Sequence, residues 1–285
     1  MTVAVARAMA RPLIPLLLFA TPLHAQDWRT LDAARQMGPT APLRVDVSYG
    51  LGAFDLRAAA APVRYHVAMR YDAAATEPMY SYDGATGALR IGGRRRGSSI
   101  RRSPESETGE LRVELGPGQP LDVSLDLSGA SATTDLSGLD VRTLFIRQRA
   151  VTGRLRIAAP NSGALALLRI DAAGASFRAS GLGNARARRV LLEVTAGEVD
   201  LAFDGAWDAD TEVDLSATLA GVRLRVPADV GVRVEHGGRL GTVEHEGLIR
   251  RGPYLESANY ARATHHLIVR STTRLAQLTI DHAAP

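Results

Sequence analysis

A β-solenoid, an all-β fold in which short parallel strands stack in successive rungs, is the fold class that this sequence predicts. Two observations predict it. Glycines recur at steps of 24, 21, 23 and 24 residues, at Gly129, Gly153, Gly174, Gly197 and Gly221. The phrase Ser-Gly-Leu also repeats after 43 residues, at positions 137–139 and 180–182. Rungs of about 22 residues with two strands each give stacked parallel sheets.

Apolar and polar residues alternate within these rungs. Leucine or valine occupies every second position in residues 121–128. Because the side chains of a strand point alternately to opposite faces, the pattern predicts one buried and one solvated face. A shift of one residue would expose the whole apolar row, so the pattern also fixes the register. We expect the solenoid proper to span residues 121–235.

The segments on either side are expected to cover the open ends of the stack. Residues 43–120 show the same period of two and are interpreted as an N-terminal β region. Residues 236–285 begin with a glycine-rich stretch and contain two further apolar runs, which predict C-terminal capping strands. Residues 26–42 are interpreted as a lead-in segment, either a short helix or a loose connection. An antiparallel sandwich is the alternative architecture.

The N-terminus has the organisation of a secretory signal peptide. Arg7 and Arg11 precede an apolar core at residues 13–20, and Ala25 offers a small residue at the cleavage edge. We therefore predict cleavage after Ala25 and a periplasmic or secreted protein. A short buried helix or an uncleaved anchor is the alternative. No later stretch has the roughly 20 apolar residues that a spanning helix needs.

The composition excludes several classes of function. The 285 residues are 46% hydrophobic and 22% charged, which is ordinary for a folded protein. The net charge of +4 falls to +2 when Arg7 and Arg11 leave with the leader, too little to favour nucleic acid as a partner. There is no cysteine, so no disulfide forms after export.

A basic segment interrupts the N-terminal β region. Residues 92–109 combine glycine, serine and charge, which predicts an exposed loop. Its candidate binding residues for an anionic phospholipid or polymer are five arginines, Arg94, Arg95, Arg96, Arg101 and Arg102. The alternative is a solvated hairpin loop without a ligand.

Candidate metal ligands gather near the C-terminus. A zinc site needs three or four ligands that converge on the ion. Three candidates are His236, Glu244 and His245, which could supply them only if a turn brought them together. Otherwise they are exposed polar residues around a glycine-rich corner. We assign no catalytic residue and no cofactor to this chain. Carboxylates considered for glycoside cleavage stand beside turns or on outer strand faces, where aspartate ordinarily serves turn geometry: Asp126, Asp135, Asp140, Asp171 and Asp200.

Several short sequence motifs, taken in their order along the chain, are similar to those of a known family. These motifs are residues 48–56, 71–72, 77–78, 135–139, 173–174, 179–184, 197–203 and 221–227, followed by 231–232. In this order the chain resembles the toast-rack family of bacterial domains of unknown function. That family is related to the C-terminal domain of LiaF-type envelope-stress regulators and to putative-adhesin domains. The resemblance implies a β-solenoid outside the cytoplasm or at the membrane and no known catalysis. The chain lacks the N-terminal transmembrane helices of the LiaF type.

The sequence thus predicts an exported, non-enzymatic β-solenoid that acts as an interaction or envelope-associated module, and the resemblance adds a link to envelope stress as an expectation. Its expected partner is an envelope protein or an anionic polymer, and the sequence specifies no oligomeric state. Two alternatives stay open. One is a carbohydrate-active or metal-dependent hydrolase or lyase on the same scaffold, and the other is a structural assembly in which solenoid ends stack edge to edge.

Overall fold

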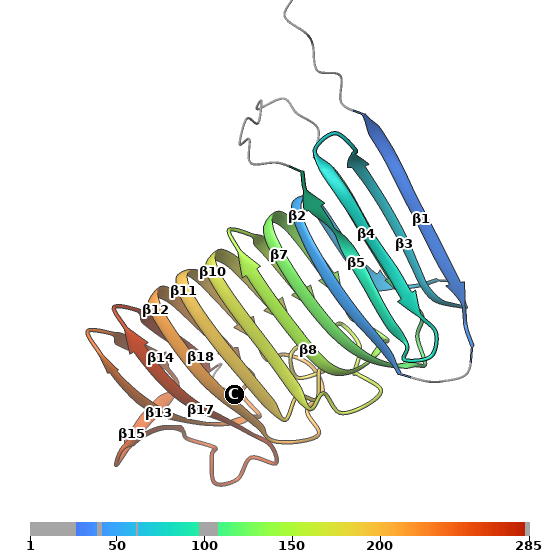
Figure 1. The fold of residues 1–285 in the computed structure, drawn as a ribbon. Coiled ribbons are helices and arrows are strands. Elements are labelled where there is room, and N and C mark those ends of the chain that lie inside the picture. The colour runs from blue at the N-terminus through green and yellow to red at the C-terminus, as the bar shows by residue number, and fades with distance from the viewer. Residues whose placement is uncertain (1–26, 39–41, 61, 97–107, 283–285) are drawn as a thin grey trace, which may run out of the picture.

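The computed structural model describes residues 27–282 apart from 39–41, 61 and 97–107. The predicted signal peptide, residues 1–25, lies outside this part of the chain. The described residues form 18 strands and no helix, so the all-β prediction is confirmed (Figure 1). In this part of the chain, no helix of the length and hydropathy needed to cross a membrane is found.

The middle of the chain forms a row of strands that follow one another in sequence order. They are β7 (Pro120–Asp135), β8 (Asp140–Arg149), β9 (Thr152–Arg156), β10 (Leu167–Ser180), β11 (Arg189–Ala202) and β12 (Thr211–Val226). Neighbours pair in parallel, with Ile170 beside Leu192 and Leu192 beside Leu215. Apolar side chains therefore stack on apolar side chains from one rung to the next.

Each rung bends near its middle. The first half of β10 pairs with β8, whereas its second half pairs with β9. We call the strand segments before the bend the first half-sheet and those after it the second half-sheet. At the bend, one residue per rung has a positive φ of 50° to 59°: Gly129, Ala150, Gly174, Ala196, Leu219, Leu240 and Leu275. The pairing register places these corner residues side by side along the stack.

The recurring glycines of the sequence are not equivalent positions in this register. Gly129 and Gly174 are corner residues, but Gly153, Gly197 and Gly221 follow the corner residues of their rungs, Ala150, Ala196 and Leu219, by three, one and two residues. Alanine and leucine occupy the left-handed conformation at those rungs. The glycines thus mark the corner only approximately. Of the three that follow it, only Gly197 has a neighbouring backbone, that of Ala175, where a Cβ would lie.

The N-terminal strands combine parallel and antiparallel pairs. They are β1 (Trp28–Gln36), β2 (Leu43–Ala58), β3 (Val63–Asp72), β4 (Thr76–Asp83), β5 (Ala88–Arg95) and β6 (Gly109–Leu115). Strand β2 pairs in parallel with β7 along most of its length, so the parallel stack begins at Leu43 and not at residue 121. The antiparallel pairs β4–β5 and β1–β3–β6 extend the two half-sheets beyond β2.

The lead-in segment also differs from our expectation of a helix or a loose connection. Trp28–Gln36 is a strand that pairs with β3, with Leu31 beside Met69. Pairing across β3 supplies partners for its backbone groups, which outweighs the weak local preference of this short segment.

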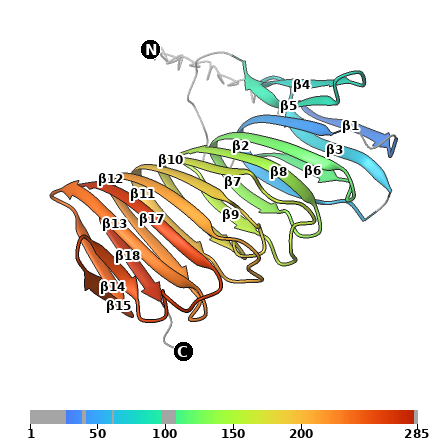
Figure 2. The ribbon, with the colours of Figure 1, turned by 90° about the horizontal axis from the view of Figure 1, so that it is seen from below.

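The C-terminal strands do not follow sequence order. They are β13 (Gly231–Arg239), β14 (Thr242–Glu246), β15 (Leu248–Arg251), β16 (Tyr254–Ser257), β17 (His266–Arg274) and β18 (Gln277–His282). Strands β17 and β18 insert between β12 and the pair β13–β14 (Figure 2). They form an internal rung, although residues 236–285 were all expected to cap the stack. The strands at its end are β13–β16, which begin at Gly231, inside the predicted solenoid.

The core lies between the two half-sheets. The predicted inward rows are buried in all rungs: Leu168 and Ile170 of β10 are 0% exposed, as are Leu201 of β11 and Leu224 of β12. Burial alternates with exposure along each long strand, as a sheet with one solvated face requires. This leaves the outer faces, the corner and the two ends as places where the protein can meet a partner.

Candidate functional site

The outer face of the first half-sheet carries large apolar side chains at positions where alternation predicts polar ones. Phe145 is 40% exposed, and the half-buried Leu191 lies in the same row, with Arg169 between them in register. Leu167 and Ile268 are two further half-buried examples on this face. The outward positions of the second half-sheet from β9 to β18 hold no aromatic or branched aliphatic side chain. The two outer faces are therefore chemically different.

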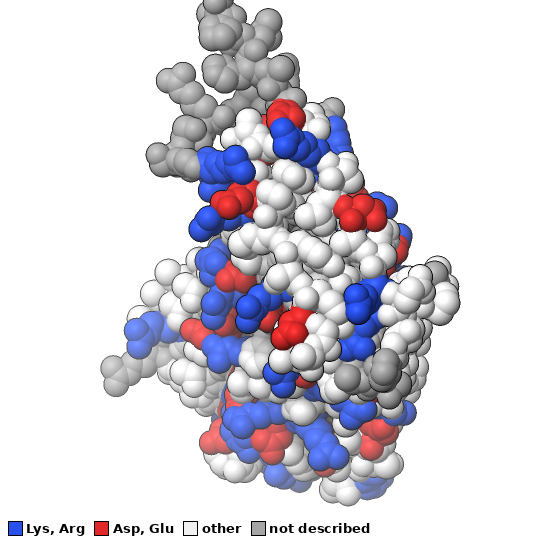
Figure 3. Space-filling view, turned by 45° about the vertical axis from the view of Figure 1, so that its right-hand side comes forward, with Lys and Arg blue, Asp and Glu red and all other residues white. Residues whose placement is uncertain are grey.

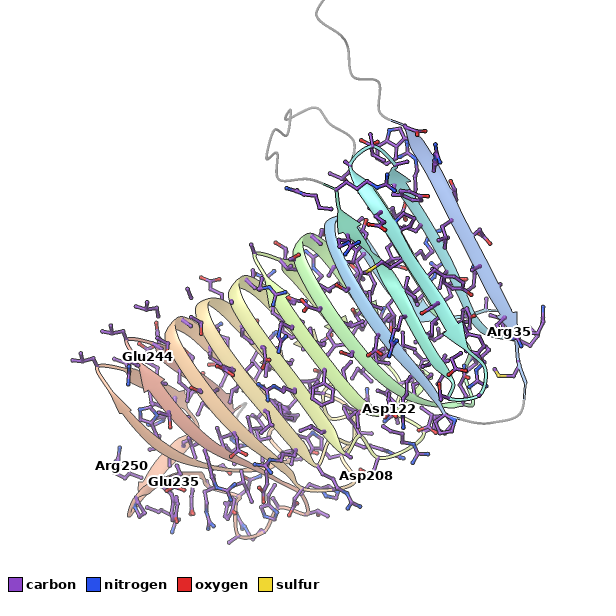
Figure 4. All side chains as sticks on the ribbon, viewed as in Figure 1. Arg35, Asp122, Asp208, Glu235, Glu244 and Arg250 are labelled. Atoms are coloured by element: carbon purple, nitrogen blue, oxygen red, sulfur yellow. The ribbon has the colours of Figure 1, made fainter. Side chains whose placement is uncertain are left out.

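A shallow trough of about 520 Å³ lies beside these apolar residues. The floor of the trough is formed by Ser216, Thr272 and Gly237, which lie side by side in register and have small side chains or none. Charged residues surround this floor: Arg169, Asp171, Glu193, Asp214, Glu235 and Arg270. We call this hollow the outer trough. Figure 4 shows Glu235 at the C-terminal end of the stack, far from Arg35 at the other end.

Ion pairs fix most of the charged groups of the outer trough. Arg169 Nε lies 2.9 Å from Asp171 Oδ1, and Arg270 Nη1 lies 3.0 Å from Glu212 Oε2. These hydrogen bonds raise the pKa of both guanidinium groups. Among the described residues, Glu235 has no ion-pair partner. Four carboxylates against two guanidinium groups give the lining an acidic excess, and the groups together offer several hydrogen-bond acceptors to a hydroxyl-rich or cationic ligand.

The carboxylates considered for glycoside cleavage are each close to an arginine. Asp126 contacts Arg149 at 2.7 Å, Asp140 contacts Arg142 at 2.9 Å and Asp200 contacts Arg225 at 3.0 Å. Asp171 pairs with Arg169, and Asp135 lies 3.8 Å from Arg156. Arg147 stands between Asp126 and Asp171, within 3.9 Å of both. An arginine therefore fills the space that a reacting glycosidic bond would need between these two carboxylates.

The three candidate metal ligands near the C-terminus are not brought together. His236 lies on β13 in the first half-sheet and makes a 2.9 Å contact from Nδ1 to Ser271 Oγ. Glu244 and His245 lie on β14 in the second half-sheet. Within the described ranges, no group of three or more His, Asp or Glu residues is placed to hold a metal ion. The bend between β13 and β14 separates the two histidines, so the structure does not bring these three residues together.

The basic segment is part strand. Gly92–Arg95 belong to β5 and pair with β4, which shortens the loop that we expected at 92–109. Arg94 Nη2 lies 2.8 Å from Glu77 Oε2 of β4. Arg101 and Arg102 lie outside the described residues. An anionic ligand for Arg94, Arg95 and Arg96 stays a prediction. On the face drawn in Figure 3, acidic and basic residues are interspersed.

Sequence reasoning missed the apolar outer face. A signal for it is present, because Leu144-Phe145-Ile146 and the run Val190–Leu192 are three consecutive apolar residues within an alternating strand. The central residue of such a run must point outward when its two neighbours point inward. Reading the runs as interruptions of alternation would have identified Phe145 and Leu191.

Comparison with known proteins gives a likeness in structure only. No family model matches the sequence, and no curated protein matches it. A "putative cell adhesion protein" from Clostridium sporogenes covers 90% of this chain and 100% of its own length, with 13% identity and a TM-score of 0.44. A "putative adhesin" from Bacteroides fragilis covers 91% and 98%, with 9% identity and a TM-score of 0.35.

A further similar structure is a "putative lipid binding protein" from Parabacteroides distasonis. It covers 89% of this chain and 96% of its own, with 10% identity and a TM-score of 0.29. TM-scores this low do not establish a shared fold, so the proposals below rest on this chain's own residues. The relation to toast-rack and LiaF-type proteins stays a prediction.

Proposed function

We propose that this chain is an exported, non-catalytic β-solenoid that binds a partner through the outer face of its first half-sheet. The carrying observation is the difference between the two outer faces. Phe145 and Leu191 are exposed or half-buried beside the outer trough, whereas the equivalent rows of the second half-sheet are polar. Exposed aromatic and aliphatic side chains next to arginine are typical of the central part of an interface.

The arrangement supports binding more than hydrolysis. The carboxylates nearest the face are engaged by arginines, and Arg147 occupies the space between Asp126 and Asp171. Small residues along the trough floor leave room for an extended ligand lying across several rungs. A peptide segment or an envelope polymer fits such a surface, because neither requires a deep pocket.

A photo-crosslinking experiment tests this proposal. A photoreactive amino acid replaces Leu191 in one variant and Arg178, an exposed outward residue of β10 in the second half-sheet, in the matched control. Each protein is irradiated in envelope extract of the source organism. We expect a discrete adduct from position 191 and none from position 178. Phe145→Ser introduced into the 191 variant should remove the adduct.

Two outcomes would contradict the proposal. Equal adducts from both positions would show non-specific contact, and the absence of any adduct at 191 would show that this face meets no envelope component. Circular dichroism of the Phe145→Ser protein is the control for folding. Because Phe145 is already 40% exposed, its replacement should change stability little.

A further inference from the structure

Three exposed leucines occupy equivalent corner positions on the last three rungs. The register of β12 with β17 and β18 places Leu219 beside Leu275, and that of β13 with β17 places Leu240 on the other side of Leu275. Their exposed fractions are 60%, 53% and 82% for Leu219, Leu275 and Leu240. We call these three residues the leucine ridge.

Neither the backbone nor the core favours leucine at these positions. All three residues have a positive φ between 50° and 59°, which costs about 1–2 kcal/mol for a residue other than glycine. The exposed side chains recover little of this through burial. The rungs from β7 to β11 have glycine or alanine at the same corner, at Gly129, Ala150, Gly174 and Ala196. The fold therefore does not require leucine here, and a strained, exposed apolar row points to a contact with something else.

The shape of the leucine ridge limits what it can contact. The outer trough, lined here by Ser271 and Thr272, lies on one side, and a second hollow, lined by Gly221 and Gln277, lies on the other. The ridge is thus a convex edge between two hollows. At a strand spacing of about 4.8 Å, it is only about 10 Å long. A stable protein interface needs about 800 Å² per partner, which three leucines do not supply.

A lipid bilayer needs no complementary surface. Apolar side chains on a convex edge enter the boundary between headgroups and acyl chains, which lies about 5–10 Å deep. The residues that flank the leucine ridge on its own rungs suit this position. Thr218 and the exposed Arg274 precede Leu219 and Leu275, and Gly221, Gln277 and Thr242 follow the bend.

None of these flanking residues is acidic. The nearest carboxylates in register are Glu198, beside Gly221 on the neighbouring rung, and Glu244, two residues beyond Thr242. Among the described residues, Arg274 has no ion-pair partner. It is therefore available to a lipid phosphate, as a basic residue next to an inserted apolar side chain would be at an anionic membrane surface.

We propose that the leucine ridge inserts into the surface of an anionic lipid bilayer and holds this end of the stack at a membrane. The chain lies on the membrane through these side chains and does not span it. This contact leaves the outer face of the first half-sheet for the partner described above, so the two proposals stand or fall separately.

The absence of cysteine allows a direct test, because a single introduced cysteine is the only site that a thiol-reactive dye can label. Leu240→Cys in the full chain is labelled with a fluorophore whose emission rises and shifts to the blue in an apolar environment. Thr133→Cys, on an exposed outer position of β7, is the matched control. We then add phosphatidylcholine vesicles in which about 30% of the lipid is the anionic phosphatidylglycerol.

We expect the emission at position 240 to rise on these vesicles and to fall again when the bilayer contains a lipid-attached quencher, while position 133 does not respond. Because the dye reports its own position, binding through the leader alone leaves the emission at 240 unchanged. Leu219→Asn together with Leu275→Asn should weaken the affinity for vesicles about tenfold. Asparagine tolerates the left-handed conformation, so this variant is expected to remain folded.

Three results would overturn the proposal. The first is an unchanged emission at position 240 although the protein co-sediments with the vesicles. The second is a double asparagine variant that binds vesicles as tightly as the parent protein. The third is the same change in emission without vesicles at high protein concentration, which would show that a second copy covers the ridge. An equal response to pure phosphatidylcholine would overturn the role given to Arg274.

Discussion

The hydroxyl oxygens of Tyr65 and Tyr80 lie 2.8 Å apart and join the two half-sheets at the N-terminal end of the stack. Tyr65 comes from β3 of the second half-sheet and is 1% exposed, while Tyr80 comes from β4 of the first. The ring of Tyr82 lies 5.1 Å from that of Tyr65. Aromatic side chains therefore close an end that no further rung of the described part of the chain covers.

The tyrosine pair predicts coupled losses of stability. Tyr65→Phe should lower the free energy of unfolding by about 1 kcal/mol, because the hydrogen bond is lost and the ring remains. Adding Tyr80→Phe to that variant should cost little more, since the bond is already absent. Denaturant unfolding measures both. Tyr254→Phe at the other end is the control, and additive losses from the two tyrosines would contradict the coupling.

Two glycines with similar φ should respond differently to alanine. Gly174 has φ 57° and open space where a Cβ would lie, so Gly174→Ala should cost about 1 kcal/mol of backbone strain. A Cβ on Gly181, with φ 76°, would overlap the carbonyl oxygen of Ile157. We expect Gly181→Ala to cost more than about 2 kcal/mol, because overpacking adds to the strain. Thermal unfolding compares them, and equal losses would argue against this register.

Asn184 ties two neighbouring turns together. Its side-chain amide donates to the carbonyl oxygen of Ile157 at 2.9 Å, and its Oδ1 accepts from the backbone N–H of Ala206 at 2.8 Å. Asn184 is 8% exposed. Asn184→Ala should therefore destabilise the protein by about 1–3 kcal/mol, since both backbone groups lose a partner. The exposed Gln277 gives a matched control, because Gln277→Ala should change denaturant unfolding by less than about 0.5 kcal/mol.

His66 predicts a loss of stability as pH rises. Its ring nitrogens lie 3.1 Å from Glu114 and 3.2 Å from Asp32, and hydrogen bonds to these carboxylates raise its pKa. A histidine whose pKa is raised on folding stabilises the protein fully below the unfolded pKa of about 6.5 and loses that contribution as pH rises through the folded pKa. The decline between pH 6 and 8 should be about 0.2–1 kcal/mol, as for exposed ion pairs.

The same site has an acidic counterpart. Glu114 also pairs with Arg57 at 2.6 Å, and its pKa is lowered first by that hydrogen bond and then by His66. Its contribution is therefore present above the unfolded pKa and lost as pH falls through the folded one. Unfolding of His66→Gln between about pH 3 and pH 8 separates the two groups, because the loss from Glu114 occurs below the ordinary glutamate pKa of about 4.3. The decline above pH 6 should disappear in this variant while the loss at low pH remains; an unchanged decline would assign it elsewhere.

Export makes a further prediction. Expression of the full chain in a bacterium with a periplasm should yield a protein that begins at Gln26, because Ala25 is the expected cleavage edge. N-terminal sequencing of the periplasmic fraction measures this. Ala25→Arg should leave the leader attached, and a native chain that starts at Met1 would contradict the signal-peptide interpretation.

The sequence by itself determined the secondary structure class and the composition of the core. Alternation placed Leu168, Ile170 and Leu224 inside, and all three are fully buried. This works because the side-chain period of a strand depends on local geometry, and a buried face admits only apolar residues. The same local rule, applied to runs of three apolar residues, would also have pointed to Phe145.

The tertiary structure alone decided which strands are neighbours. Residues 266–282 lie between β12 and β13, although β13 follows β12 in the chain. Backbone pairing is nearly the same for any sequence, so several alternating strands are equally suitable neighbours until side chains pack across the core. The leucine ridge depends on this order, because Leu219, Leu275 and Leu240 become adjacent only when the last rung inserts. Leu275 meets Leu219, 56 positions before it in the chain, and Leu240, 35 positions before it, through a register that no local pattern encodes.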